Sequence, residues 1–104
     1  MDLTSELAEE YAQWFQCLSD PTRLRILNFV THATGPITVG DVVDAIGKSQ
    51  STVSRHLQIL AVDTFVFMET DGVKTLVSPN SACMTALPMA AAAIMGSPTE
   101  TDAP

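Results

Sequence analysis

The feature that most constrains this chain is a pair of short helical segments joined by one tight turn at Gly47. The first segment begins at Thr38, which forms a capping-box-like pair with Asp41 three residues later. Gly47 suits the left-handed position after such a helix. Ser49 is then the expected N-cap of a second helix that continues to about Ala61. Two short helices joined in this way form a helix-turn-helix.

The second of these helices has two chemically different faces. At about 100° per residue, Val53, Leu57 and Leu60 fall in one sector, which predicts the core side. The opposite sector carries hydroxyl, amide and guanidinium groups, which read base edges and hold phosphates in protein–DNA complexes. These residues are Ser51, Ser54, Arg55 and Gln58. A solvated amphipathic helix would show the same pattern, but the elements on either side favour the DNA-reading interpretation.

The segment after the helix-turn-helix changes to a pattern typical of strands. Phe65–Thr70 and Val73–Val77 are both β-prone, and Asp71-Gly72 between them predicts a two-residue hairpin loop. A hairpin at this place is a wing. The predicted fold is therefore mainly α with a small β-hairpin, a winged helix-turn-helix with four helices before the wing and one after it.

Two helices are predicted before the helix-turn-helix. Apolar residues between Leu3 and Leu18 recur at spacings of three and four, which predicts one amphipathic helix. Asp20 followed by Pro21 marks the start of the next helix, which should end near Thr31. We expect its core-facing residues to be Leu24, Leu27 and Val30.

The segment from Ala82 to Met95 is almost entirely apolar or small. Leu87 precedes Pro88 and is disfavoured from helical angles, so we expect a short helical turn near 81–86 and then a helix from Pro88 to Met95. A helix that is apolar all round must be buried on all sides. A chain of 104 residues can hardly do this alone, which predicts a dimer interface at this last helix. The apolar stripe of the first helix fits either core packing or a subunit interface. The candidate interface residues are Leu3, Leu7, Tyr11, Trp14, Leu87, Met89 and Ile94.

Composition bounds the remaining possibilities. The length predicts one domain, residues 1–96, followed by a disordered acidic tail, residues 97–104. No apolar run is long enough to span a membrane, and the acidic N-terminus does not resemble a signal peptide, so we expect a cytoplasmic location. The net charge of −7 argues at first against nucleic acid. Between Pro21 and Leu60, however, four basic residues and two acids leave a local charge of +2.

Two stretches carry a resemblance to a known family. DPTRLRIL at 20–27 and SQSTVSRHL at 49–57 resemble the ArsR/SmtB family of winged-helix repressors, in particular an actinobacterial branch. The resemblance implies a homodimer that binds an imperfect palindrome in promoter DNA with one recognition helix in each major groove. It places the wing at Phe65–Ser78. The DNA-binding candidates are Lys48, Ser49, Gln50, Ser51, Ser54, Arg55, His56, Gln58 and Lys74.

The sequence departs from the family's pattern in its wing and in its sensor residues. Glu69 and Asp71 flank a turn that is usually basic, and Thr64 stands where glycine is common. The paired cysteines and the Asp and His ligands that the family uses for metals are absent from their usual helices. Cys17, His32 and Cys83 remain as candidate ligands for a weakly bound nickel or zinc ion. The alternatives for the cysteines are packing as small buried hydrophobes or a redox role, and we expect no required cofactor.

These features predict a transcription regulator whose partners are double-stranded promoter DNA, a second copy of the chain and an accessory protein, with no membrane partner. The alternative is a protein-interaction module that keeps the fold but binds DNA weakly; the net charge and the acidic wing favour it. We do not expect an enzyme, because the sequence has no acid–base pair, no nucleophile–base spacing and no Gly-rich phosphate loop.

Overall fold

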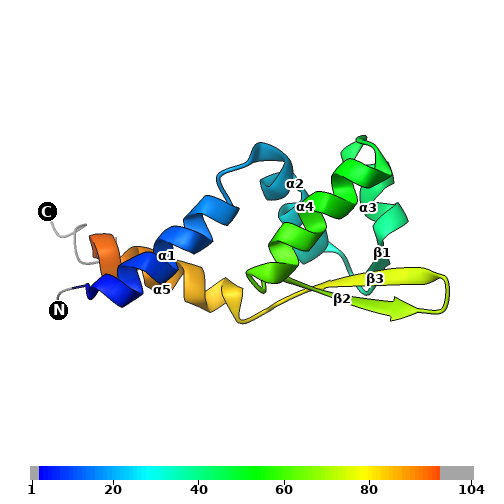
Figure 1. Cartoon of the computed structure of the whole chain (residues 1–104). Helices are drawn as coiled ribbons and strands as arrows, with labels where there is room; N and C mark the ends of the chain where they lie inside the picture. Colours follow the sequence, from blue (N-terminus) through cyan, green and yellow to red (C-terminus); the bar gives the residue numbers. More distant parts are fainter. Residues whose placement is uncertain (1–2, 97–104) are drawn as a thin grey trace, which may run out of the picture.

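The computed structural model describes residues 3–96 and contains five helices and three short strands in that range. Figure 1 shows α1 and α5 at one end of the molecule and the hairpin of β2 and β3 reaching to the other. The elements in chain order are α1 (Ser5–Cys17), α2 (Pro21–His32), β1 (Ile37–Thr38), α3 (Val39–Ile46), α4 (Gln50–Val62), β2 (Val66–Asp71), β3 (Lys74–Pro79) and α5 (Cys83–Met95).

The predicted caps of the helix-turn-helix are confirmed. The Thr38 hydroxyl accepts a hydrogen bond from the Asp41 N–H at 3.1 Å, and the Asp41 carboxylate accepts one from the Thr38 N–H at 2.9 Å. Gly47 has φ +77°, which a side chain would strain, and ends α3 in the left-handed conformation. Ser49 caps α4 by accepting from the Thr52 N–H at 3.2 Å. This local chemistry fixes the angle between α3 and α4.

The core lies where α2, α3 and α4 meet the sheet. The expected inward residues of α4, Val53, Leu57 and Leu60, are fully buried. Leu24 was expected to face the core as well, but this is wrong, because 48% of its surface is exposed. Val30 is buried as expected, and Ile26, four residues before it on α2, occupies the core in place of Leu24. Leu24 lies on the neighbouring face of the helix.

The sheet has the order β1-β3-β2, with both pairs antiparallel. The sequence did not predict β1, a two-residue strand that pairs with Leu76 and Val77 of β3. The hairpin loop is also displaced by one residue from the prediction. Asp71 pairs with Lys74, so the loop is Gly72-Val73 rather than Asp71-Gly72. Gly72 has φ +64° and Val73 does not have a positive φ, which are the signs of a type II′ turn.

Helix α5 is continuous from Cys83 to Met95, with Pro88 inside it. The expected break at Leu87 is therefore wrong. Leu87 packs against the core, and this contact outweighs its conformational preference before proline. Pro88 has no N–H to donate to the carbonyl of Met84, so α5 lacks one internal hydrogen bond.

One chain buries little of α5. Ala90 is buried, whereas Met84, Met89, Ile94 and Met95 are between 47% and 74% exposed. The Cα radius of gyration is 15.9 Å, compared with about 13 Å for a compact domain of about 100 residues. The apolar end formed by α1 and α5 thus extends away from the main core. No helix of the described residues is long and apolar enough to cross a membrane, and the expected tail at 97–104 lies outside them.

Candidate nucleic-acid interface

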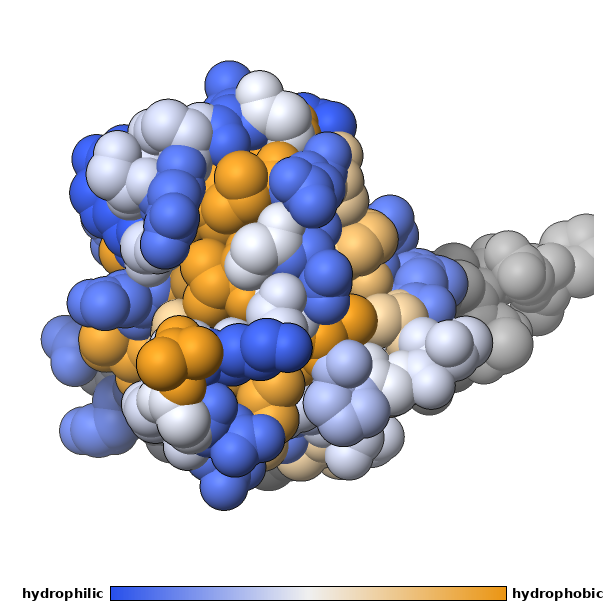
Figure 2. Space-filling model, turned by 90° about the vertical axis from the view of Figure 1, so that its right-hand side faces the viewer, coloured by the Kyte–Doolittle hydropathy of each residue, from blue (hydrophilic) through white to orange (hydrophobic). Residues whose placement is uncertain are grey.

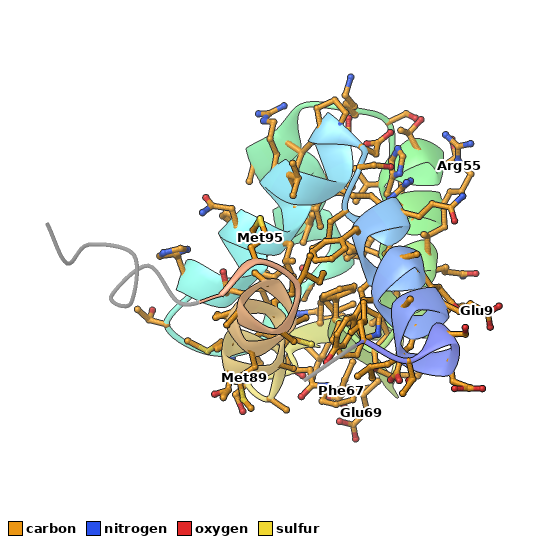
Figure 3. All side chains as sticks on the ribbon, turned by 90° about the vertical axis from the view of Figure 1, so that its left-hand side faces the viewer. Glu9, Arg55, Phe67, Glu69, Met89 and Met95 are labelled. Carbon is orange, nitrogen blue, oxygen red and sulfur yellow. The ribbon has the colours of Figure 1, made fainter. Side chains whose placement is uncertain are left out.

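The exposed side of α4 carries the polar groups that the sequence places there. Ser51, Arg55 and Gln58 are exposed, and Ser54 is half-buried. Figure 3 shows Arg55 projecting from the edge of the molecule that is farthest from Met89 of α5. The buried side of the same helix holds its backbone in place. The guanidinium, hydroxyl and amide groups of α4 are therefore presented outward from a rigid element.

The start of α4 uses its hydroxyl groups mainly to stabilise the helix. Ser49 Oγ donates to Thr52 Oγ1 at 2.9 Å in addition to accepting from the Thr52 N–H. Ser49 and Ser51 also place their hydroxyl oxygens 3.3 Å apart. Lys48 and Gln50 are exposed beside this cluster. Anions are favoured at such a helix N-terminus, where backbone N–H groups lack partners.

A groove runs between α4 and the hairpin. Its lining brings Gln50, Ser54 and Gln58 of α4 together with Lys74 of β3. The sequence assigned these four residues to one surface, and the fold places them around one groove. Figure 2 shows this side of the molecule, where apolar surface lies between hydrophilic side chains. The apolar part of the groove comes from Val39, Met68 and Val73.

Sequence reasoning did not find several residues of this groove. Thr38 and Asp41 reach it because β1 joins the edge of the sheet, which the sequence analysis overlooked. The β-branched run Ile37-Thr38-Val39 was the available signal for this strand. The Asp41 carboxylate brings negative charge into the groove, although it is engaged by the Thr38 N–H.

His56 does not lie on the exposed face of α4, in contrast to its assignment as a DNA contact. It is 7% exposed, and its Nδ1 lies 3.1 Å from the guanidinium of Arg23. Burial lowers the pKa of His56, and the nearby Arg23, Arg55 and Lys48 lower it further, against the opposite effect of Asp20. His56 is therefore a neutral residue between α2 and α4 at neutral pH.

The wing carries acidic groups on its exposed surface. Glu69 and Asp71 of β2 and Lys74 of β3 are exposed, and Val73 at the loop is fully exposed. Figure 3 shows Glu69 and Phe67 projecting together from this strand. Of these three charged residues, Lys74 lines the groove beside α4, whereas Glu69 and Asp71 are not among its lining residues.

The candidate dimer residues divide into two groups. Trp14 and Leu87 pack partly against the chain's own core and line one cavity between α1, the segment that joins α4 to β2, and α5. Tyr11 and Leu7 are half-buried, and the Tyr11 ring lies 5.3 Å from the Trp14 ring. The exposed group consists of Leu3, Met89 and Ile94.

The candidate metal ligands have separate partners in the chain. Cys17 Sγ donates to the Ile59 carbonyl at 3.9 Å, and Cys83 Sγ donates to the Thr64 carbonyl at 3.6 Å. His32 is exposed near the end of α2, with Nδ1 2.8 Å from the Asn28 carbonyl. Within residues 3–96, no three His, Cys, Asp or Glu side chains are grouped to hold a metal ion.

Both thiols are in surroundings that disfavour the thiolate. Burial, followed by the nearby Asp63 carboxylate, raises the pKa of Cys17 to about 11, and Arg23 opposes this shift. Burial also raises the pKa of Cys83. The thiolate is the form that binds metals and attacks electrophiles, so both residues carry inert thiols at neutral pH.

The tight turn between α3 and α4, the exposed polar side of α4 and the hairpin beside it define a winged helix-turn-helix. Residues 20–61 match the family described as "Bacterial regulatory protein, arsR family". This segment covers α2, β1, α3 and nearly all of α4. The resemblance to the ArsR family is therefore confirmed over residues 20–61.

Two curated relatives share this part of the sequence. The HTH-type transcriptional regulator NmtR of Mycobacterium tuberculosis is 41% identical over 58 residues, which are 56% of this chain and 47% of that protein. A probable mercury resistance operon repressor of Streptomyces lividans is 40% identical over 63 residues, which are 61% of this chain and 49% of that protein. The chain thus spans about half the length of these relatives.

Solved structures are similar over more of the chain. NolR from Sinorhizobium fredii has a TM-score of 0.70 at 27% identity, and the match covers 93% of this chain and 98% of that one. Mb0332 from Mycobacterium bovis, described as a homodimeric winged helix-turn-helix DNA-binding domain, has a TM-score of 0.68 at 25% identity. That match covers 88% of this chain and 86% of the other.

Proposed function

We propose that this chain is a sequence-specific transcriptional regulator that binds a palindromic promoter operator as a homodimer. The observation that carries the proposal is the exposed row of Ser51, Arg55 and Gln58 on a helix whose opposite side is anchored in the core. Arginine pairs with guanine and glutamine with adenine in the major groove, and serine bonds either kind of base edge. The contacting residues proposed are those around α4 together with Lys74, without His56.

The homodimer is supported by the exposed apolar surface of α5. Met89, Ile94 and Met95 expose large apolar side chains on this one helix, and exposed apolar surfaces mark interaction sites. The description of Mb0332 as homodimeric supports the same assembly. A two-fold symmetric dimer presents two copies of α4 and so favours a palindromic site with half-sites about one helical turn apart.

Fluorescence anisotropy with full-length protein tests this function. Labelled duplexes of about 30 base pairs, which accommodate two half-sites, would tile the DNA upstream of the chain's own gene. A scrambled duplex of the same length and composition is the control. We expect one duplex to bind at least about a thousandfold more tightly than the scrambled one. Equal affinity for all of these duplexes would contradict the proposal.

The second candidate is a protein-interaction module with the same fold and weak DNA binding. The net charge of −7 and the exposed Glu69 and Asp71 on the wing favour it. The salt dependence of binding separates the two functions, because phosphate contacts make log K fall steeply with log salt concentration. The interaction module predicts weak affinity without preference among duplexes.

We further propose metal responsiveness as a secondary property of the regulator, with nickel or zinc as the first ions to test. The similarity to a probable mercury resistance operon repressor supports this proposal and adds mercury to the ions to test. No resident cofactor is proposed, and the expected place of action is the cytoplasm, where promoter DNA is found.

A further inference from the structure

Arg23 of α2 connects three parts of the chain through its guanidinium. Its Nε–H donates to the carbonyl of Cys17, the last residue of α1, at 2.6 Å. Its NH1 group lies 3.1 Å from Nδ1 of His56 on α4. The backbone N–H of Arg23 donates to the Asp20 carboxylate at 3.0 Å. One side chain therefore spans the end of α1 and the middle of the candidate recognition helix.

This contact determines which ring nitrogen of neutral His56 carries the proton. An arginine guanidinium carries only donors and does not lose its charge in proteins. Nδ1 of His56 must therefore accept the hydrogen bond from Arg23, which leaves the imidazole neutral with its proton on Nε2. In the sequence of α4, His56 follows Arg55, which is exposed on the polar side of the helix, and precedes Leu57, which is fully buried. A movement of His56 would consequently displace the groups on either side of it.

The charges around His56 come from three elements. Asp20, the N-cap of α2, is the acidic neighbour and favours the imidazolium. Arg23 of α2, Arg55 of α4 and Lys48 in the turn before α4 disfavour it, and burial disfavours it most. From α1, Cys17 contributes its carbonyl, which is already occupied by Arg23. The site is therefore built for the neutral imidazole.

We propose that Arg23 is a positioning residue for the recognition helix, because it holds neutral His56 and the end of α1 at the same time. Protonation of His56 then releases α4 and lowers the selectivity for operator DNA. This inference rests on the proposed DNA-binding function. A proton on Nδ1 would make both facing groups donors and both groups cationic at 3.1 Å. The hydrogen bond would be lost, and the guanidinium would have to turn away from α4.

The first test replaces Arg23 by lysine in the full-length protein at neutral pH. Lysine keeps the charge but lacks the planar fork that contacts two acceptors at fixed angles. We expect the ratio of affinities for the tightest upstream duplex and the scrambled duplex to fall at least about fivefold, the lower end of typical couplings. Arg25→Lys is the matched control, since Arg25 is exposed on the same helix. An unchanged ratio in folded Arg23→Lys protein would overturn the positioning role.

The second test is a pH profile of the same affinity ratio on both sides of the His56 titration. An acidic protein loses negative charge at lower pH and then binds all DNA more tightly. The affinity ratio removes this general effect, because it acts on both duplexes alike. Wild type should lose selectivity as His56 becomes protonated, whereas His56→Asn, whose amide oxygen can accept near the Nδ1 position, should not. A His56-dependent gain on acidification would overturn the inference and would instead make His56 a phosphate contact.

Nitrogen NMR of the histidine rings tests the contact without DNA. At neutral pH, His56 should show an unprotonated Nδ1 and a protonated Nε2, and the spectrum also gives the titration midpoint needed for the pH profile. The exposed His32 provides an internal comparison. A protonated Nδ1 on His56 at neutral pH would overturn the inference even if operator binding is found. Absence of any selective duplex would instead contradict the proposed function, while leaving this spectrum interpretable.

Discussion

The N–H of Phe65 donates to the carbonyl of Leu60 at 2.9 Å, and both side chains are buried against the core. Between them, the N–H of Thr64 donates to the Ala61 carbonyl at 3.0 Å. This pair of bonds is a Schellman motif, and its apolar contact fastens the end of α4 to the start of the hairpin. The motif requires a left-handed residue, and Thr64 supplies it with φ +60°.

Thr64→Gly should raise the free energy of unfolding by about 1 kcal/mol, because a β-branched side chain is strained in the left-handed conformation. Urea unfolding measures the change. Gly47→Ala is the reverse substitution, because it adds a side chain at another left-handed position. Gly47 has φ +77° and nothing within 4 Å of an added Cβ. The alanine should therefore destabilise through strain alone, by about 1 kcal/mol. A lower unfolding free energy for Thr64→Gly would contradict this account.

Arg55→Ala should weaken operator binding by about 1–3 kcal/mol without unfolding the domain, because Arg55 is exposed on α4 and contributes no core packing. Anisotropy and circular dichroism measure the two effects. Arg55→Lys keeps the charge and loses the bidentate geometry, so it should reduce selectivity more than affinity for scrambled DNA. Unchanged affinity in Arg55→Ala would show that this face of α4 does not read the operator.

Met89→Glu should convert the dimer to a monomer, because it places a charge on the exposed apolar surface of α5. Removal of all residues after Asn80 should leave an insoluble or monomeric chain. Sedimentation velocity gives the oligomeric state. Val73→Glu serves as the control, since Val73 is fully exposed on the hairpin at the other end of the molecule. A well-folded monomer of the full-length wild type would exclude the dimer.

The free energy of unfolding should fall on mild acidification, because His56 becomes protonated. Its folded-state pKa lies below the ordinary value of 6.5, so the unfolded chain binds this proton more readily. The contribution of neutral His56 to the free energy of unfolding is complete above about pH 6.5 and is lost as the pH falls toward the folded-state pKa. Urea midpoints across this range measure it, and His56→Asn should remove this part of the slope. Asp20 acts in a separate window, because its pKa is lowered and its contribution is lost only below about pH 3.8.

Nickel, zinc and cobalt should change operator affinity less than about a hundredfold, within the range of typical allosteric couplings. The reason is that Cys17, Cys83 and His32 each have their own hydrogen-bond partner. Titration of each ion into the protein–DNA complex measures the coupling. A larger change in operator affinity would contradict this prediction. If Cys83→Ser or His32→Ala abolished that change, the result would locate a metal site that the fold of one chain does not form.

The sequence predicted those parts of the fold that local chemistry determines. The caps at Asp20, Thr38 and Ser49 are hydrogen bonds between residues three apart, so their spacing is visible in the chain. The division of α4 into a buried and an exposed face follows from helical periodicity alone. These two signals were sufficient for the helix-turn-helix and for most of the candidate DNA-binding residues.

Three of the predictions that failed depend on contacts between distant residues. Strand β1 exists because Ile37 pairs with Val77, forty positions later. His56 is buried because Arg23 reaches it from another helix, and α5 continues past Leu87 because that side chain packs on the core. No periodicity in the local sequence encodes such contacts.

The distribution of charge has a consequence for how this protein would search a genome. Four of its five basic residues, Arg25, Lys48, Arg55 and Lys74, are exposed, against a net charge of −7. Few phosphates can be neutralised, so random DNA would hold the protein only briefly. Long one-dimensional sliding along DNA requires stronger non-specific binding than this. The operator would therefore be found by repeated three-dimensional encounters, and occupancy would follow the number of protein copies in the cell closely.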